Sequence, residues 1–205
     1  MEHLEIEVKF FLSDPDDLRN RLLDRGARCI RPRTFETNVC YETADNRLQK
    51  SNCLLRLRKD PDTTLAFKSS PAESDPRFKV YRELEVRVDD FTTMDAVLQS
   101  LGFFRRQAYE KWREIWRHNH ATVCLDTMPF GSFLEIEGDA DQIITIAHDL
   151  GLAWEHRIRC SYLSIFAVLR DQEGLPFGDV TFGNFKSVPC RFDPYRRRFE
   201  AGEAA

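Results

Sequence analysis

The chain has 205 residues, of which 42% are hydrophobic and 12% aromatic, so it can form one domain with a substantial core or two very small ones. Its formal net charge of −4 is the difference between 34 acidic and 30 basic residues. This balance gives no overall attraction to nucleic acid or to an anionic membrane. No stretch approaches the roughly 18 apolar residues of a membrane span.

The start of the chain and the cysteines indicate the compartment. Residues 1–12 carry acids and lack the long apolar run of a signal peptide. The six cysteines show no C-x-x-C spacing, which disfavours a zinc site, and they are typical of reduced core residues. We therefore expect a cytoplasmic protein.

The first half of the chain predicts one helix followed by a series of strands. Asp14 and Pro15, followed by two acids, are typical of a helix N-terminus, and Gly26 marks its end. Residues 70–77 have the composition of a mobile loop. The predicted strands span residues 3–11, 34–42, 53–59, 63–69 and 78–88.

The second half predicts three more strands and three more helices. Strands are expected at about 104–117, 120–126 and 132–137, and helices at about 91–101, 139–150 and 159–171. Residues 174–205 are rich in glycine, proline and phenylalanine and predict no definite element; they either fold back as a cover or are partly disordered. We therefore expect one domain over residues 1–173 and a C-terminal extension over residues 174–205.

Three of the predicted strands carry two glutamates one residue apart within an apolar pattern. The pairs are Glu5 with Glu7, Glu83 with Glu85, and Glu135 with Glu137. Because side chains at i and i+2 of a strand share a face, each strand presents two carboxylates on one side and branched aliphatic residues on the other. Like charges gathered on sheet faces are costly unless positive charges lie between them.

The charged faces are compatible with two arrangements of the sheet. In a two-layer sandwich they would meet solvent, and cross-strand ion pairs would each contribute about 0.2–1 kcal/mol. A solvent-facing sheet usually also contains Thr, Ser, Gln and Asn, whereas these faces are nearly all Glu, Asp, Lys and Arg. We therefore expect an α+β fold in which an eight-stranded antiparallel β-barrel encloses the charged faces and the helices pack outside it.

The residue types indicate the chemistry of such an interior. Carboxylates without cysteine or histidine favour hard cations such as Mg²⁺ or Mn²⁺. Lysines and arginines that converge on the same space favour phosphate groups. The chain contains neither a Walker loop nor a G-x-G-x-x-G motif, which disfavours P-loop and Rossmann folds.

A series of short motifs follows in order along the chain. The motifs are Glu5-Ile6-Glu7-Val8-Lys9, Leu55-Arg56-Leu57-Arg58, Lys68, Glu83 with Glu85, Lys111 with Arg113, Val123-Cys124-Leu125-Asp126, Phe133-Leu134-Glu135-Ile136-Glu137 and Ser161-Tyr162-Leu163. In this order they resemble the CYTH family, the triphosphate tunnel metalloenzymes, over roughly residues 3–170. This superfamily includes class IV adenylate cyclases, thiamine triphosphatases and inorganic triphosphatases.

The resemblance implies a tunnel, open at its ends, that binds triphosphate together with a divalent metal ion, Mg²⁺ or Mn²⁺. It implies that the metal ligands are Glu5, Glu7, Asp126, Glu135 and Glu137. The implied phosphate-binding residues are Lys9, Arg56, Arg58, Lys68, Lys111 and Arg113. Lys9, Glu85 and Arg113 are implied to take part in catalysis, with Glu85 either a further acid or a partner that orients a basic residue.

The chain departs from the family pattern at two places. The second strand of the family usually ends in Tyr-Phe-Asp-Thr, whereas this chain has Cys40-Tyr41-Glu42-Thr43. The aromatic hydroxyl that some members place near the N-terminal lysine is therefore expected to be absent or shifted. The basic residue that often precedes the late Ser-Tyr is replaced by Cys160, with Arg159 one position earlier.

The leading functional prediction is a metal-dependent phosphohydrolase acting on inorganic triphosphate, thiamine triphosphate or a nucleotide. The first alternative is an adenylate cyclase that converts ATP to cyclic AMP and pyrophosphate, and the second is a non-catalytic module that binds polyphosphate or nucleotide. The expected partner is thus a triphosphate-bearing small molecule, with no nucleic acid and no membrane. The protein is expected to be a monomer or a homodimer.

Overall fold

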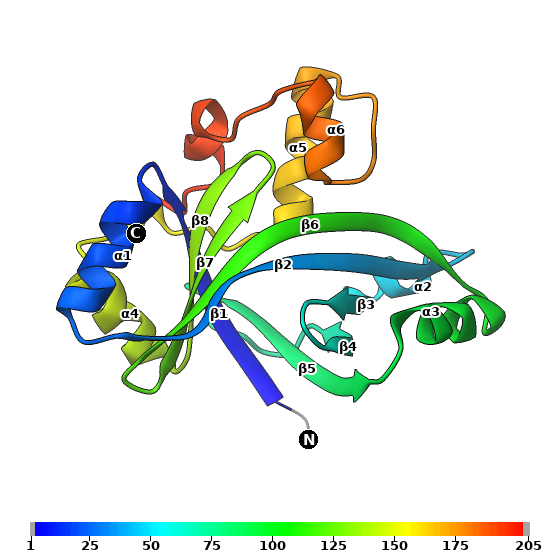
Figure 1. Cartoon of the computed structure of the whole chain (residues 1–205), viewed down its shortest axis with the longest axis horizontal. Coiled ribbons are helices and arrows are strands. Elements are labelled where there is room, and N and C mark those ends of the chain that lie inside the picture. Colours follow the sequence, from blue (N-terminus) through cyan, green and yellow to red (C-terminus); the bar gives the residue numbers. More distant parts are fainter. Residues whose placement is uncertain (1–2, 203–205) are drawn as a thin grey trace.

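We analysed a computed structural model that describes residues 3–202 (Figure 1). Over these residues the chain forms eight strands connected mostly as hairpins. The strands are β1 (His3–Leu12), β2 (Arg28–Thr43), β3 (Cys53–Lys59), β4 (Thr63–Ser69), β5 (Lys79–Val88), β6 (Phe103–His118), β7 (Ala121–Met128) and β8 (Gly131–Glu137).

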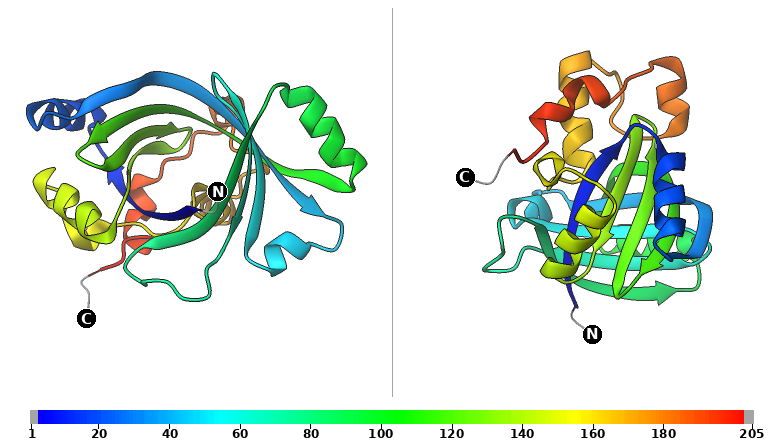
Figure 2. Two further views of the ribbon diagram at one scale, coloured as in Figure 1. Left: turned by 90° about the horizontal axis from the view of Figure 1, so that it is seen from below. Right: turned by 90° about the vertical axis from the view of Figure 1, so that its left-hand side faces the viewer.

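The eight strands form one antiparallel sheet whose hydrogen bonds close into a ring. The strand order is β1-β5-β4-β3-β2-β6-β7-β8, and β8 returns to β1 to complete a closed barrel. The register of that last pair places Lys9 opposite Glu135 and Glu7 opposite Glu137. The predicted eight-stranded antiparallel sheet of an α+β fold is therefore confirmed, and Figure 2 shows the ring of strands seen from below.

The remaining chain forms six α-helices and two short 3-10 helices within the described residues. They are α1 (Pro15–Asp24), α2 (Arg47–Lys50), α3 (Phe91–Ser100), α4 (Ala140–Asp149), η1 (Trp154–His156), α5 (Tyr162–Glu173), α6 (Phe182–Ser187) and η2 (Asp193–Arg198). As predicted, Asp14 caps α1, because its carboxylate accepts hydrogen bonds from the backbone N–H groups of Asp16 and Asp17. No helix within residues 3–202 is long and apolar enough to cross a membrane.

The outward side chains of the strands are apolar, and helices cover much of that surface. Leu18 and Leu22 of α1 and Ile143 and Ile146 of α4 pack with the outer residues of β1, β7 and β8, such as Val8, in one core cluster. Because the apolar faces are buried outside the ring, the charged faces are left to line its interior.

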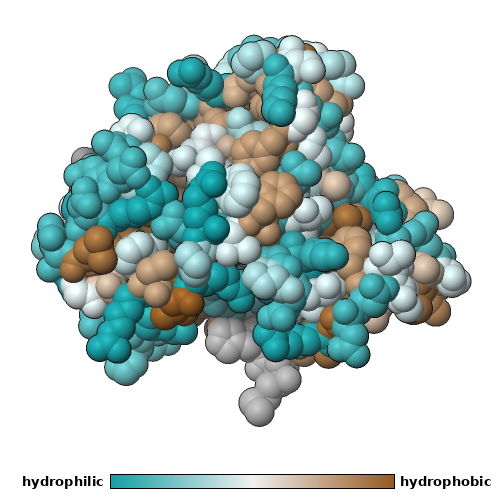
Figure 3. All heavy atoms as spheres, viewed as in Figure 1, coloured by the Kyte–Doolittle hydropathy of each residue, from teal (hydrophilic) through white to brown (hydrophobic). Residues whose placement is uncertain are grey.

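Part of the outer surface remains uncovered. Leu84 and Val86 of β5 are about half exposed, as is Leu4 of β1. The space-filling view shows a mostly hydrophilic surface with scattered apolar patches (Figure 3). Because β1 pairs with β5 and side chains at i and i+2 of a strand share a face, these three residues lie on the same outer face of the sheet.

The segment after the barrel closes one of its ends. α5, α6 and the last described residues lie at one end of the ring of strands (Figures 1 and 2). They form a second apolar cluster together with inward-facing residues from the ends of several strands. Those strand residues include Phe11, Cys40, Tyr109, Met128 and Phe133. The sequence predicted no definite element for residues 174–205, and residues 174–202 fold back as a cover. The expectation of a tunnel open at both ends is therefore wrong at the end that this segment covers.

Several element boundaries differ from the prediction for local reasons. β2 begins at Arg28 rather than at residue 34, because its pairing with β6 continues through two register shifts. The first lies between Cys29 and Arg31, and the second, between Arg31 and Thr34, spans Pro32, which lacks a backbone N–H. α5 begins at Tyr162 rather than at residue 159, because the Ser161 side chain caps it and the chain just before it pairs with β1. The short helix α2 was missed, since four residues carry too little periodicity to be recognised.

Candidate active site

The predicted site residues all face the barrel interior, where oppositely charged side chains pair across the strands. Seven cationic residues line the interior: Lys9, Arg56, Arg58, Lys68, Lys79, Lys111 and Arg113. Eight carboxylates face them: Glu5, Glu7, Glu36, Glu83, Glu85, Asp126, Glu135 and Glu137.

Lys9 lies at the centre of the β1–β8 side of the interior. Its Nζ contacts Glu7 and lies 3.2 Å from Oε1 of Glu135, and the residue is 1% exposed. Burial lowers the pKa of Lys9, but the carboxylates of Glu135 and Glu7 outweigh this and hold it well above its ordinary value. Lys9 is therefore a fixed positive charge in the interior.

Glu7 is shared between two lysines. Lys79, on β5, places its Nζ 2.6 Å from Oε1 of Glu7, the same oxygen that Lys9 contacts. Burial raises the pKa of Glu7, but Lys79 and Lys9 outweigh burial and hold it well below its ordinary value. The pKa of Lys79 is lowered, mainly by burial, which Glu7 only partly offsets.

A second group of charges connects β1 with β3, β4 and β5. Lys68 contacts Glu5, and its Nζ also lies 3.3 Å from Oε1 of Glu83. Arg56 donates a hydrogen bond of 3.2 Å to the hydroxyl of Tyr109. Because β5 lies between β4 and β1, the Lys68–Glu5 contact spans an intervening strand, so both side chains lie on the same, inner face of the sheet.

Asp126 is the most heavily engaged acid. It accepts hydrogen bonds from Nε of Arg113 at 2.6 Å, from Nζ of Lys111 at 3.1 Å and from the Tyr162 hydroxyl at 2.9 Å. Arg113 also contacts Glu135 and so links the two acids. The sequence predicted Asp126 as a metal ligand, whereas in this arrangement its oxygens orient three hydrogen-bond donors.

Glu137 has no such partner. Among residues 3–202 no side chain forms an ion pair or hydrogen bond with its carboxylate. Burial, together with the neighbouring carboxylates of Glu5 and Glu7, raises the pKa of Glu137 to about 7. Uncompensated negative charge is therefore concentrated at this end of β8.

On the opposite side of the interior, several buried polar atoms have no hydrogen-bond partner. They are Nε of Arg56 and Arg58, Oγ1 of Thr64, Oδ1 of Asn38, Oε2 of Glu36 and Oε1 of Glu83. Two of them nevertheless lie within ion-pair distance of an opposite charge: Oε1 of Glu83 is 3.3 Å from Nζ of Lys68, and Nε of Arg58 is 3.8 Å from Oδ2 of Asp60. Buried polar atoms normally form hydrogen bonds, so this cluster on β2–β5 indicates a space that water or a ligand occupies.

A family match identifies the fold that carries these charges. The family model described as the CYTH domain matches residues 3–156. The chain belongs to the CYTH family. The match covers every strand of the barrel and ends before α5, so α5, α6 and η2 lie outside the matched region.

Individual relatives of this CYTH chain are distant in sequence but match over nearly their whole length. A "putative adenylate cyclase" of Methanocaldococcus jannaschii is 23% identical over 173 residues, which cover 79% of this chain and 98% of that protein. The solved structure of a "putative adenylate cyclase" from Vibrio parahaemolyticus superposes with a TM-score of 0.72 at 19% identity, over 82% of this chain and 99% of that one.

A third relative comes from the plant Hippeastrum. Its structure is described as a "putative adenylyl cyclase" that reveals a dominant triphosphatase activity; it has a TM-score of 0.56 and 19% identity and covers 86% of this chain and 98% of that one. At such identities the likeness shows that the fold is shared.

The donor chemistry of the CYTH barrel fits a hard divalent cation, although the acids are not gathered into a cluster. Within residues 3–202 no group of three or more His, Cys, Asp or Glu side chains is arranged to hold a metal ion. Instead Glu5 and Glu7 are turned toward lysines. The oxygen-only donor set and the unpaired carboxylate of Glu137 nevertheless match the preference of Mg²⁺ and Mn²⁺.

The structure modifies the role of the middle glutamate pair. The Glu85 side chain is 38% exposed and lies 3.1 Å from Nη2 of Arg58, near the rim of the barrel. Glu83 is 18% exposed and lies closer to Lys68. Of the two, Glu83 is the deeper acid, although the sequence argument selected Glu85 as the catalytic one.

Two interior residues that sequence reasoning missed are Glu36 and Lys79. Glu36 is 1% exposed, and its Oε1 lies 3.5 Å from Nζ of Lys111. Burial raises the pKa of Glu36, but Lys111 and three arginines, led by Arg113, outweigh burial and lower it to about 2. The alternation in the second and fifth predicted strands could have revealed both residues, since each lies on the charged face of its strand.

The aromatic hydroxyl near Lys9 comes from a different element than the family pattern suggests. Tyr41 points outward, where its hydroxyl donates to Asp95 of α3 at 2.7 Å. The ring of Tyr162, at the start of α5, lies 5.3 Å from Nζ of Lys9 and 5.5 Å from Nζ of Lys111. Tyr41 of the second strand therefore places no hydroxyl beside Lys9, and the aromatic ring that lies there belongs to α5, whose hydroxyl donates to Asp126.

Proposed function

We propose that this protein is a divalent-metal-dependent phosphohydrolase that acts on a triphosphate-bearing small molecule inside its barrel. One observation carries the proposal: a closed ring of strands encloses seven cationic and eight acidic side chains, with one acid unpaired and several donors unsatisfied. Burying this many charges is costly unless bound ligands of both signs complete the pairing. A triphosphate with its metal ion supplies both signs.

The basic residues are placed to bind the phosphates. Arg56 and Arg58 each have a buried Nε–H without a hydrogen-bond partner, and a guanidinium can donate two parallel hydrogen bonds to one phosphate. Lys9, Lys111 and Arg113 form a second basic group beside Tyr162. A chain of phosphates that contacts both groups is held straight along the interior, which orients its terminal phosphorus for attack.

The residues that would hold Mg²⁺ or Mn²⁺ are Glu5, Glu7, Glu135 and Glu137. When bound, the cation would neutralise charge on phosphate oxygens and lower the pKa of the attacking water. Lys9 and Lys68, which now contact Glu7 and Glu5, would turn toward the phosphates. Asp126 would keep Arg113 and Lys111 oriented toward the substrate.

Hydrolysis is favoured over cyclisation by the lining of the interior. Its side chains are nearly all charged and match a polyphosphate, whereas a cyclase must also hold the nucleoside so that its 3′-hydroxyl reaches the α-phosphorus. The dominant triphosphatase activity described for the Hippeastrum relative supports the same choice.

Adenylate cyclase activity is the second candidate. The descriptions of the relatives from Methanocaldococcus jannaschii and Vibrio parahaemolyticus favour it. It requires the same metal and basic residues, but it releases pyrophosphate rather than orthophosphate. The third candidate, a module that binds polyphosphate without turnover, requires the same charges and no attacking water.

The test is to incubate the purified protein with tripolyphosphate, ATP or thiamine triphosphate, each with Mg²⁺ or Mn²⁺, and to measure orthophosphate, pyrophosphate and cyclic AMP. We expect orthophosphate release that depends on the metal, without cyclic AMP. Cyclic AMP and pyrophosphate in equal amounts from ATP would establish the cyclase instead. Tight binding of tripolyphosphate with no turnover of any substrate would establish the binding module.

A further inference from the structure

The second half of strand β5 has a free edge near the rim of the barrel. On one side β5 pairs with β4 as far as Val88, but on the other side it pairs with β1 only as far as Glu83. Among residues 3–202 no strand pairs with this edge beyond Glu83, and Figure 1 shows β5 along the lower margin of the molecule. The backbone N–H and C=O groups of such an edge are available to a strand of another chain.

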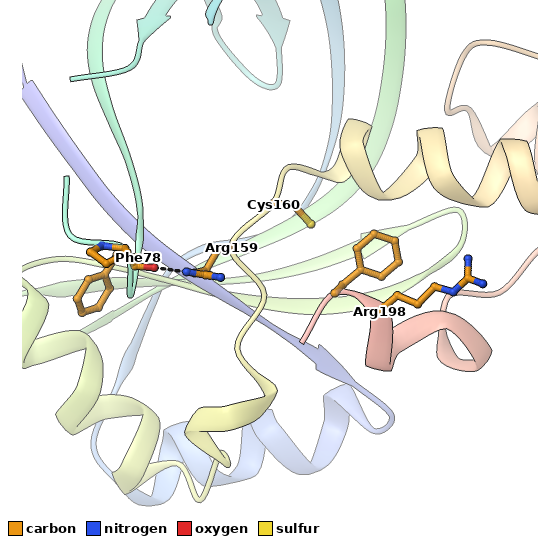
Figure 4. A pocket seen from close by; sticks show the side chains of 6 residues that line it. Phe78, Arg159, Cys160 and Arg198 are labelled. Atoms are coloured by element: carbon orange, nitrogen blue, oxygen red, sulfur yellow. Dashed lines mark hydrogen bonds between the residues drawn. The ribbon is translucent and has the colours of Figure 1, made fainter. Parts of the chain in front are cut away.

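The first half of β5 is fixed by its surroundings. Figure 4 shows the Arg159 side chain directed toward the segment that precedes β5, where it donates a hydrogen bond to the backbone carbonyl of Pro76. Phe78 lies in the core cluster, and the residues from Lys79 to Glu83 pair with β1. Because this half is fixed, the free edge that follows it has a defined position, and a partner strand can pair with it at little cost in ordering.

Four consecutive residues of the free half, from Leu84 to Arg87, are exposed. On the outer face, Leu84 and Val86 are 51% and 56% exposed. On the inner face, the side chains of Glu85 and Arg87 are 38% and 76% exposed. Each of these two charges forms an ion pair within the chain, but pairs at such exposure contribute little to stability and can be exchanged for others.

The sequence of this edge is complementary to itself when two copies run antiparallel. Residues 84–88 read Leu-Glu-Val-Arg-Val. About a two-fold axis at Val86, Glu85 of each copy lies opposite the partner's Arg87, and Leu84 lies opposite the partner's Val88. Opposite charges directly across a strand pair contribute about 0.2–1 kcal/mol for each pair, and the two-fold axis generates two such pairs.

Other registers of the same two edges are disfavoured. A shift by one residue would put the apolar outer face of one copy on the same side of the joined sheet as the charged face of the other. A shift by two residues would place Glu85 opposite the partner's Glu85, or Arg87 opposite the partner's Arg87, and like charges directly opposite are destabilising. The sequence therefore favours one register. Because two-fold pairing uses the edge of each copy once, the assembly ends at a dimer.

We propose that two copies of this chain associate by antiparallel pairing of their β5 edges over residues 84–88, which joins the two barrels through a continuous sheet. On the outer face of that sheet, Leu84 and Val86 of each copy meet those of the other, which removes exposed apolar surface from water. The paired segment is short, so we expect a reversible dimer with a Kd of about 1–100 µM. The inference does not depend on the proposed function.

Sedimentation velocity over a series of protein concentrations tests the association. We expect wild type to change from monomer to dimer between about 1 and 100 µM. Glu85→Arg and Arg87→Glu each replace both cross-strand ion pairs by pairs of like charge, and each should raise the Kd of the dimer about tenfold or more. Asp24→Arg and Arg25→Glu, at exposed positions where α1 ends, make the same changes of charge and should leave the Kd unchanged. A wild type that remains monomeric at all concentrations would overturn the proposal.

A mixture of the two variants tests the register itself. When Glu85→Arg is mixed with Arg87→Glu, each arginine of one copy lies opposite a glutamate of the other, so pairing is restored only between unlike copies. We expect native mass spectrometry to detect a heterodimer with a Kd near that of wild type, and the double variant Glu85→Arg/Arg87→Glu to form a homodimer again. Circular dichroism checks the fold of each variant. A dimer that persists in both single variants, or a mixture that stays monomeric, would overturn the proposal.

Discussion

The barrel interior has two unlike walls. On β1 and β8 lie Glu5, Glu7, Glu135 and Glu137, and every one of them except Glu137 contacts a lysine or arginine. On β3 and β4 lie Arg56, Arg58 and Lys68, and both arginines retain an Nε–H without a hydrogen-bond partner. The acidic wall thus has excess negative charge and the basic wall has unused donors, so each is suited to a ligand of the opposite sign.

The two walls depend on each other. Lys68 reaches from the basic wall to Glu5 on the acidic wall, and between the walls Arg113 of β6 joins Asp126 of β7 to Glu135. A buried charge that loses its partner is strongly destabilising, so each of these pairs supports the arrangement of the interior. Bound metal and triphosphate would replace these ion pairs with contacts of their own. The interior charges are thus paired with each other in the absence of ligands and can pair with the ligands when they bind.

The largest effect is expected from neutralising the acidic wall. Glu5→Gln and Glu135→Gln each should lower metal-dependent turnover about 100-fold or more, because each removes a carboxylate needed for the cation while preserving its shape. Steady-state kinetics measure turnover, and circular dichroism checks the fold. The control is Glu155→Gln, at an exposed position in η1. Activity unchanged in both variants would mean that these acids serve only the structure.

The unpaired acid should make stability depend on pH. The folded pKa of Glu137 is raised to about 7, so the folded state binds an extra proton, and the stability this contributes at low pH is lost as the pH rises through about 7. For the metal-free protein we expect the free energy of unfolding to fall by on the order of 2 kcal/mol between about pH 5 and pH 8 from this group.

Urea denaturation of wild type and Glu137→Gln at the two pH values measures this effect. The variant should lose less stability as the pH rises, and Mn²⁺ should restore the wild type at the higher pH because a cation offsets the carboxylate. Parallel pH dependences for the two proteins would show that Glu137 is paired in solution.

Substitution on the basic wall should affect substrate binding more than metal dependence. Arg58→Ala is expected to raise KM for tripolyphosphate about tenfold, since it removes a charge-assisted hydrogen bond to phosphate. The concentration of Mg²⁺ that gives half-maximal activity should change little. Arg87→Ala, at a 76% exposed side chain of β5, is the control. If the half-maximal Mg²⁺ concentration changed by as large a factor as KM, the two walls would not act separately.

The smallest effect is expected where the C-terminal cover meets the walls. Tyr162→Phe removes the 2.9 Å hydrogen bond to Asp126 but keeps the ring beside Lys9. We expect a loss of about 1–2 kcal/mol in the free energy of unfolding, measured by urea denaturation. A variant as stable as wild type would show that water replaces the hydroxyl without cost.

Much of the barrel wall could be predicted from the sequence. Alternation with a period of two is a local property, so Glu5 and Glu7, or Arg56 and Arg58, could be assigned to one face of a strand without knowledge of the fold. The same reasoning placed β3 and β4 at their observed boundaries. The order of the motifs along the chain predicted the family, and the match to the CYTH domain over residues 3–156 confirms it.

The sequence by itself therefore indicated which face of most strands carries the charged side chains and that both signs of charge lie on it, although Glu36 and Lys79 were not selected. Only the tertiary structure decided how the charges are distributed, because pairing depends on the register of strands far apart in the chain. The closure of β8 onto β1 places Glu137 beside Glu7 and leaves it unpaired, whereas Asp126 meets Arg113, Lys111 and Tyr162. The position of the cover was likewise decided by the tertiary structure. α5 and α6 pack against residues from the ends of several strands, and these residues form no local pattern in the sequence.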